Sequence, residues 1–85
     1  MKTNIRIFIK KSKFEKYKQH GFIIDPEFII PENGDVIAIS EQYYIWDKDY
    51  ANKPLQVQYK RYNYGRDEQN EKICDIVIYV KPVKD

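Results

Sequence analysis

The most regular hydrophobic pattern lies in the C-terminal part of the chain. Residues 55–60 alternate apolar and polar side chains, and residues 73–80 form an apolar run rich in β-branched side chains. Alternation is typical of a strand with one buried face, and Val and Ile favour strands in general. Between these segments, residues 63–71 supply Asn, Gly and charged side chains, which are common in solvated turns. The pattern therefore predicts an antiparallel hairpin with one face in water.

Shorter segments earlier in the chain show the same kind of pattern. Ile5, Ile7 and Ile9 would point to one side of a first strand. Residues 36–40 and 43–46 are rich in Ile, Val and Tyr and predict two further strands.

A short helix is expected between the first strand and the later strands. In residues 11–21, Ser12 is followed three residues later by Glu15, a spacing that favours a helix N-terminus. Gly21 can end such a helix in the left-handed conformation. The spacing therefore predicts about two turns of helix here.

Two apolar triplets, residues 22–24 and 28–30, follow the predicted helix. Because Pro26 and Pro31 interrupt the pattern, one long central strand is excluded. We expect the triplets to form a bent edge strand that lays its apolar side chains across the core. The Asn-Gly pair in residues 31–35 then predicts a turn.

These elements together predict a mainly β (α+β) fold. It would be a small antiparallel barrel or a strongly curved sheet of roughly five to six strands, with one short helix after the first strand. A chain of 85 residues has room for one core. We therefore treat residues 1–85 as a single small β-rich domain.

Charge is distributed unevenly along the chain, although the net charge is only +2. Residues 1–20 hold seven Lys or Arg against one Glu, whereas residues 21–54 hold seven Asp or Glu against two Lys. The interpretation we favour is that the two segments lie close together and neutralise each other. The alternative is a basic face that is offered to phosphate groups.

The sequence offers little catalytic chemistry. Cys74 lies in the apolar run and His20 at the end of the predicted helix, so no nucleophile and base are placed together. One Cys and one His cannot supply the four ligands of a structural zinc site. We therefore predict no catalytic residue, no metal and no cofactor. Because no apolar stretch resembles a signal peptide or a membrane span, we expect a cytoplasmic protein without a membrane partner.

The predicted hairpin carries the candidate binding surface. Leu55, Val57 and Tyr59 are expected to share one face. The residues expected on the other face are Gln56, Gln58, Lys60, Tyr62 and Tyr64. Interleaved rings and cations are typical of sheets that bind single-stranded nucleic acid, and Tyr and Arg are also enriched in protein interfaces. Such residues can equally be ordinary cross-strand pairs. The candidate contact residues are Lys60, Arg61, Tyr62, Tyr64 and Arg66 on the hairpin, with Lys11 and Lys13 in the basic segment.

We therefore expect a non-catalytic macromolecular binding or adaptor protein that acts through a protein–protein interface. Its Lys-, Ile-, Asn- and Tyr-rich composition is typical of an AT-rich genome, such as that of a phage or another mobile element. One alternative is a small barrel that binds single-stranded nucleic acid, although we favour a protein partner over nucleic acid. A second alternative is a metal-independent endoribonuclease of toxin type, with Lys, Arg, Tyr and His as acid, base and phosphate clamp. An uncovered edge strand would also let the chain form a homodimer.

Overall fold

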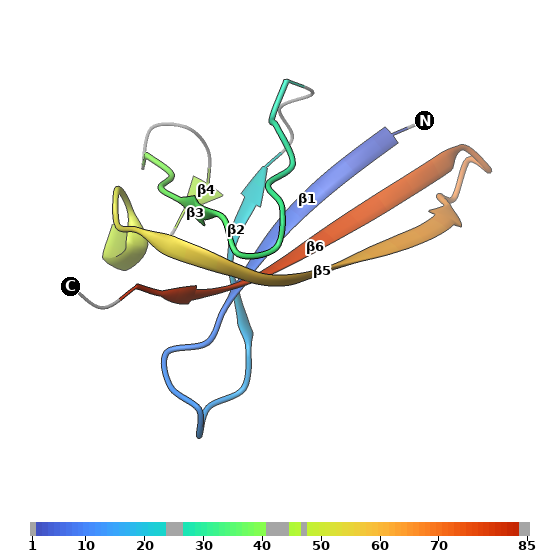
Figure 1. Ribbon diagram of the computed structural model, residues 1–85. Coiled ribbons are helices and arrows are strands. Elements are labelled where there is room, and N and C mark those ends of the chain that lie inside the picture. The colour runs from blue at the N-terminus through green and yellow to red at the C-terminus, as the bar shows by residue number, and fades with distance from the viewer. Residues whose placement is uncertain (1, 24–26, 41–44, 47, 84–85) are drawn as a thin grey trace.

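The structure of the chain, a computed structural model, describes residues 2–23, 27–40, 45–46 and 48–83 (Figure 1). This part of the chain is built almost entirely from strands, so the expected mainly β fold is confirmed. The elements are β1 (Lys2–Ile9), β2 (Lys18–Ile23), β3 (Val36–Ile37), β4 (Ile45–Trp46), the 3₁₀ helix η1 (Lys48–Tyr50), β5 (Leu55–Arg66) and β6 (Lys72–Pro82).

The six strands form one curled sheet in the order β3–β5–β6–β1–β2–β4. Among the described residues, no pairing joins β3 to β4, so the sheet is an open half-barrel (Figure 1). Of the two expected architectures, the strongly curved sheet is confirmed and the closed barrel is not.

The pairing of β1 with β6 differs from the expected antiparallel arrangement. These two strands run parallel, from Lys2 beside Ile73 to Ile9 beside Val80. The other neighbouring strands are antiparallel. A tight turn forces two successive strands to run antiparallel, but β1 and β6 lie at opposite ends of the chain and are free of that constraint. The expectation was wrong here because it treated all strands as members of hairpins.

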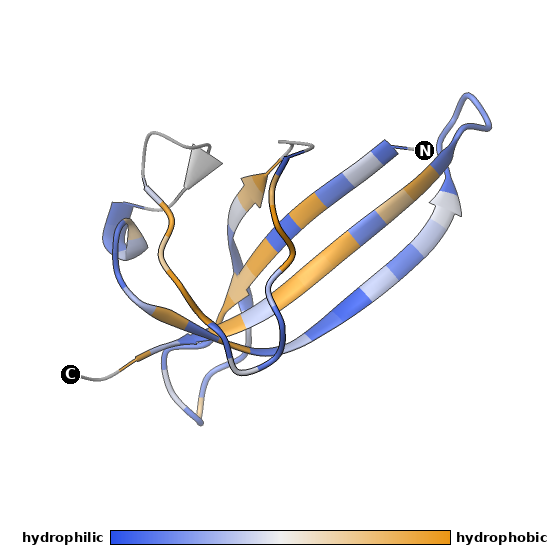
Figure 2. Cartoon of the chain, turned by 45° about the horizontal axis from the view of Figure 1, so that its top comes forward, coloured by the Kyte–Doolittle hydropathy of each residue, from blue (hydrophilic) through white to orange (hydrophobic). Residues whose placement is uncertain are grey.

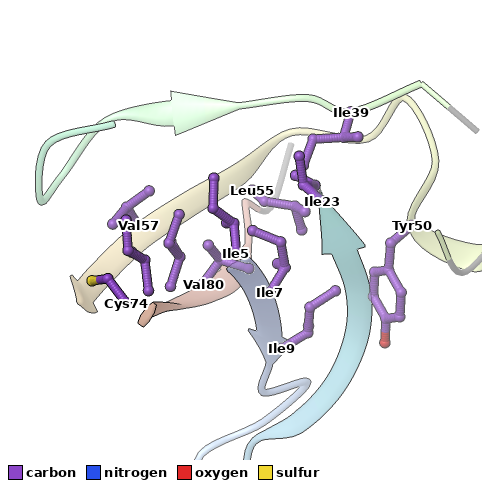
Figure 3. Close-up of a cluster of buried hydrophobic side chains, with 12 residues drawn as sticks. Ile5, Ile7, Ile9, Ile23, Ile39, Tyr50, Leu55, Val57, Cys74 and Val80 are labelled. Atoms are coloured by element: carbon purple, nitrogen blue, oxygen red, sulfur yellow. The ribbon is translucent and has the colours of Figure 1, made fainter. Parts of the chain in front are cut away.

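The core lies on the face of the sheet that carries the isoleucines of β1, which we call the inner face. Ile5, Ile7 and Ile9 are at most 3 % exposed. The parallel register places each of them beside an apolar residue of β6 that is buried as well. These pairs are Ile5 with Ile76, Ile7 with Ile78 and Ile9 with Val80. Side chains from β2, β5 and the segments that cross the inner face complete this cluster (Figure 3).

β6 is buried on both of its faces. Val77 and Tyr79 point to the opposite, outer face and are also buried, although they do not belong to the inner cluster. Central strands with a parallel neighbour are usually covered on both sides, and their sequences then lack alternation. This double burial explains the unbroken apolar run at residues 73–80.

The expected helix after the first strand is absent, and this prediction was wrong. Residues 11–17 form a turn in which the Glu15 amide donates to the Ser12 carbonyl (3.2 Å) and the Phe14 amide donates to the Ser12 hydroxyl (3.3 Å). The Ser–Glu spacing therefore closes one turn and no more. Because Phe14 is 87 % exposed, no burial of its ring offsets the cost of starting a helix. In the described part of the chain, helical structure is confined to η1.

The expected bent edge strand is also absent. The first apolar triplet lies partly in β2, which pairs with both β1 and β4 and is therefore not an edge. Ile24 and Pro26 lie outside the described residues. In the second triplet, Phe28 and Ile30 pack against the core cluster without forming a strand, and Ile29 is exposed.

The strand expected at residues 36–40 is shorter than predicted, and only the last two residues of the strand expected at 43–46 belong to the described part of the chain. β3 and β4 have two residues each, and residues 43–44 lie outside the described part of the chain. The turn before β3 has Gly34 at a φ of 91°, which glycine adopts without strain. This turn is held on β5, because the Gly34 amide donates to the Val57 carbonyl (2.8 Å) and the Val57 amide to the Asp35 carbonyl (2.9 Å).

The C-terminal hairpin is confirmed and is longer than predicted. β5 continues through residues 63–66, which were assigned to the turn. The loop is therefore only residues 67–71, where the Asp67 carboxylate accepts hydrogen bonds from the amides of Gln69 and Glu71, each at 2.9 Å. Such side-chain capping is a common reason for Asp in turns.

The position of the core predicts the cost of removing one methylene group. Ile7→Val should lower the free energy of unfolding by about 1 kcal/mol, because the Ile7 side chain is fully buried. The matched control is Ile29→Val, which removes the same group from an exposed side chain and should change it by less than about 0.5 kcal/mol. Urea unfolding of the two variants measures both values, and equal losses would contradict the described core.

Candidate functional site

A β-bulge in β5 decides which side chains lie on which face of the hairpin. Val57 pairs with Val80 and Tyr59 pairs with Tyr79, so Gln58 is an extra residue. Because Val80 and Tyr79 point to opposite faces, Val57 and Tyr59 do so too. The predicted sharing of one face by Leu55, Val57 and Tyr59 is therefore wrong for Tyr59.

Beyond the bulge, Lys60, Tyr62 and Tyr64 lie on the inner face, the same face as Leu55 and Val57. The prediction that they lie on the opposite face is therefore wrong. The Lys60 ammonium donates to the Pro31 carbonyl (2.8 Å) and lies 3.8 Å from a carboxylate oxygen of Glu32. Tyr62 and Tyr64 are 45 % and 72 % exposed. Lys60 therefore holds the segment that crosses the inner face, while the two rings stay open to solvent.

Four rings gather on the outer face. The Tyr79 ring stacks on the Tyr59 ring, with centroids 4.3 Å apart and planes inclined by 18°. It also contacts Tyr17 at 4.9 Å and Phe8 at 5.5 Å. Aromatic pairs of this kind add about 0.5–1.5 kcal/mol each beyond the area that they bury. Tyr79 is buried at the centre of the cluster, and Tyr59 keeps nearly half of its surface exposed.

Cationic side chains border this cluster of rings. The Arg61 guanidinium lies 5.8 Å from the centre of the Tyr79 ring, and the Lys10 ammonium lies 5.5 Å from the centre of the Tyr17 ring. Arg6 pairs with Val77 on the same face. Cations at these distances are attracted to ring faces, so the outer face combines positive charge with aromatic surface.

A groove of about 850 Å³ opens next to the rings, between residues 10–17 and the start of β5 and end of β6. We call it the basic groove, because four lysines line it and none of the described lining residues carries a carboxylate. The lining residues are Lys10, Lys11, Ser12, Lys13, Phe14, Tyr17, Gln56, Gln58, Lys81, Pro82 and Val83. Tyr17 belongs to both the groove and the cluster of rings, so the two features are continuous.

Lys11 is the lysine of the groove with the clearest electrostatic partner. A hydrogen bond with the Tyr50 hydroxyl raises the pKa of Lys11, and the nearby carboxylates of Glu15 and Asp49 add to the shift. The Lys11 ammonium lies 5.7 Å from the centre of the Tyr50 ring. Lys11 is therefore fully protonated at neutral pH and contributes a positive charge to the groove.

The described part of the acidic middle of the chain lies in two places relative to the basic groove. Asp49 lies near Lys11 and helps to raise its pKa, whereas residues 27–35 lie elsewhere. Residues 27–35 cross the inner face, where Phe28 and Ile30 pack on the core. Residues 10–18 lie at the opposite side of the view in Figure 1. The favoured interpretation, mutual neutralisation of the two segments, therefore agrees with the position of Asp49 near Lys11 but does not hold for residues 27–35, where Glu32 lies near Lys60 instead.

The structure separates the seven predicted contact residues into four places. Lys11 and Lys13 line the basic groove, and Arg61 lies on the outer face. Arg66 lies at the far end of the hairpin, where its guanidinium donates to the Asn70 carbonyl (3.0 Å). The remaining three, Lys60, Tyr62 and Tyr64, share the inner face.

Sequence reasoning missed several residues of the outer face. Tyr17 and Phe14 were assigned to a helix, Tyr59 to the core side, and Lys81 to the tail. The Lys10-Lys11 pair beside Lys13 was a usable signal for the groove. By contrast, the position of Tyr59 depends on the bulge, for which alternation gives no sign.

The described residues bring together no catalytic or metal-binding group. Cys74 is a buried free thiol, as predicted. The His20 ring packs against the Tyr50 ring with centroids 5.0 Å apart, and β2 is three strands away from β5. The described part of the chain contains no group of three metal-ligating side chains and no helix with the length and apolar character needed to cross a membrane.

Comparisons of the chain with models of protein families, with curated proteins and with solved structures found no match. The functional interpretation is therefore based on the geometry of the chain alone.

The packing of Tyr17 predicts a pH dependence of stability. Burial raises the pKa of Tyr17 above its usual 10.0, and the neighbouring Tyr59 and Tyr79 add to the shift. The folded state then binds more protons than the unfolded state at alkaline pH. The contribution of Tyr17 to stability should be complete below pH 10 and be lost as the pH rises through the raised pKa.

Denaturant unfolding between pH 8 and pH 11.5 measures this effect, and Tyr17→Phe should remove part of the alkaline loss. The matched control is Tyr64→Phe, because the Tyr64 ring is largely exposed to solvent. An alkaline profile that is identical in the wild type and Tyr17→Phe would contradict the described packing of Tyr17.

Proposed function

We propose that the protein is a non-catalytic binding protein that holds single-stranded nucleic acid across its basic groove and outer face. The observation that carries this proposal is the groove itself, in which four lysines and no described carboxylate lie beside exposed rings. Lysine ammonium groups bind phosphates as point charges, and every base can stack on an aromatic ring. The protein–protein adaptor role that the sequence predicts is a separate prediction. It concerns a different part of the sheet from the basic groove.

The arrangement of rings favours a single strand over a duplex. Phe14 is almost fully exposed at the groove, and Tyr59 is half exposed on the adjoining face. Bases must be unstacked to lie against such rings, which costs little in a single strand and several kcal/mol in a duplex. A strand lying in the groove would meet Lys13 and Lys81 first and then pass Tyr17 and Tyr59 towards Arg61.

The toxin-type ribonuclease receives no support from the placement of its proposed residues. Arg61 lies on the outer face and Lys60 and Tyr62 lie on the inner face, so they cannot act on one phosphate. His20 lies on β2, which is three strands away from β5 in the sheet, and its ring packs against the Tyr50 ring.

Fluorescence anisotropy with a labelled single-stranded oligonucleotide tests the proposal. With four phosphate contacts, the affinity should fall about 50-fold between 50 and 200 mM salt. Lys13→Gln and Lys81→Gln should each reduce the slope of log affinity against log salt by about 0.7. Phe14→Ala should weaken binding by about 1–3 kcal/mol, because one stacked base loses its ring.

Lys72→Gln is the matched control. Lys72 is an exposed lysine at the other end of the same strand as Lys81, so its loss removes the same charge away from the groove. No binding at 50 mM salt, or equal effects of Lys72→Gln and Lys81→Gln, would contradict the proposed site. Cleavage of the oligonucleotide during the titration would contradict the non-catalytic role.

A further inference from the structure

The far half of β5 forms a free edge of the sheet. β3 pairs with β5 only at Leu55 and Gln56, and the adjoining turn adds hydrogen bonds to Val57. Beyond Val57, no strand of the described chain lies on this side of β5. Figures 1 and 2 both show this half of the strand at the open side of the hairpin, and Figure 2 shows that it is mainly hydrophilic.

Hydrogen bonds at the two ends of the hairpin show which backbone groups face this edge. Near the bulge, both the amide and the carbonyl of Val57 bond to the turn at residues 34–35 and not to β6. At the far end, the Asp67 amide donates across the hairpin to the Glu71 carbonyl (3.0 Å). Hydrogen-bonded and non-hydrogen-bonded pairs alternate in an antiparallel ladder, so the register assigns every residue between these ends. The residues of β5 whose amide and carbonyl groups point away from β6 are Lys60, Tyr62, Tyr64 and Arg66.

We propose that this edge accepts an acidic, extended peptide segment of a partner protein as an additional strand. In strand addition, unpaired backbone groups of an edge bond to the backbone of the incoming peptide, and flanking side chains set its specificity. The free amides and carbonyls of Tyr62 and Tyr64 supply the hydrogen bonds. The exposed rings of the same two residues cover the inner side of the added strand.

The charge of the edge selects the chemistry of the peptide. β5 contains Lys60, Arg61 and Arg66 and no carboxylate. Glu32 already lies near Lys60, whereas Arg61 and Arg66 are exposed on either side of the free backbone groups. Opposite charges on directly facing residues of neighbouring strands stabilise the pairing. An incoming strand with Glu or Asp facing Arg61 and Arg66 is therefore the complementary ligand.

The same charges make a second copy of this chain a poor occupant. Antiparallel pairing of two β5 edges about Asn63 would place Lys60 of one strand against Arg66 of the other, and like charges facing each other destabilise a ladder. Cations on an exposed edge are also a common protection against self-association. The expected homodimer through an edge strand is therefore not favoured at β5.

This proposal is separate from nucleic-acid binding, because it uses the backbone edge of β5 beyond the bulge, although Arg61 takes part in both. The basic groove lies at the end of the hairpin where β6 finishes, whereas the free edge lies beyond the bulge on β5. Failure of one proposal leaves the other unaffected.

A synthetic eight-residue peptide, Thr-Glu-Thr-Thr-Thr-Thr-Glu-Thr, tests the proposal. Its two Glu residues are five positions apart, like Arg61 and Arg66, so they lie on opposite faces of the added strand and can meet both side chains. Its anisotropy or calorimetric titration into the wild-type protein at 50 mM salt should show binding at least about tenfold tighter than that of the matching Lys-Thr peptide. Absence of binding at millimolar peptide, or equal affinity for the two peptides, would overturn the proposal.

A pair of variants separates backbone pairing from side-chain contact. Tyr64→Pro and Tyr64→Ala both remove the ring, but only Tyr64→Pro removes the outward-facing amide and leaves the ladder to β6 intact. Tyr64→Pro should bind the acidic peptide about tenfold more weakly than Tyr64→Ala, a factor typical of a lost backbone hydrogen bond. Equal affinities of the two variants would overturn strand addition.

Amide hydrogen exchange of the wild-type protein gives a test that needs no substitution. The amides of Tyr62 and Tyr64 should exchange quickly in the free protein and slowly with the acidic peptide bound, whereas those of Arg61 and Asn63 are already bonded to β6 and should change little. Binding without protection of Tyr62 and Tyr64 would overturn the proposal. So would protection by the oligonucleotide alone, or a concentration-dependent dimer that protects the same amides.

Discussion

The functional surfaces of this small protein depend on one extra residue in the backbone of β5. Gln58 is a β-bulge, and it exchanges the two faces of the strand halfway along the hairpin. Without it, Tyr59 and Arg61 would point into the core side, and Lys60 would stand on the outer face. With it, the stacked rings of Tyr59 and Tyr79 adjoin the basic groove, and Lys60 is directed towards the segment that crosses the inner face.

The side chains that the bulge directs to the outer face find packing partners there, because β6 is covered on both sides. The parallel pairing with β1 supplies the isoleucines of the inner face. On the outer face, a cluster of rings with bordering cations takes the place of the helix that usually covers a parallel pair. Thus the outer cover of the sheet is itself rich in aromatic and cationic groups. The stability of the hairpin and the chemistry of its surface therefore come from the same side chains.

The sequence predicted those features that depend on local pattern. The alternation of Ile5, Ile7 and Ile9 and the apolar run of β6 correctly indicated strands, the core and the C-terminal hairpin. The direction of β1 relative to β6 depends on contacts between the two ends of the chain, which no local pattern encodes. The helix near Ser12 failed because its capping signal has no buried ring to support it. Of the candidate site, Lys11 and Lys13 were found by charge, whereas Tyr59 was missed because the bulge has no sign in the alternation.

The most direct test of this account is the register of the hairpin beyond Gln58, measured by nuclear Overhauser effects between α-protons in D₂O. In an antiparallel ladder, non-hydrogen-bonded partners bring their α-protons close together. The described register predicts cross-peaks between Tyr62 and Ile76 and between Tyr64 and Cys74. Cross-peaks between Arg61 and Ile76 and between Asn63 and Cys74 would show that the alternation continues without a bulge, and would contradict the assignment of both faces.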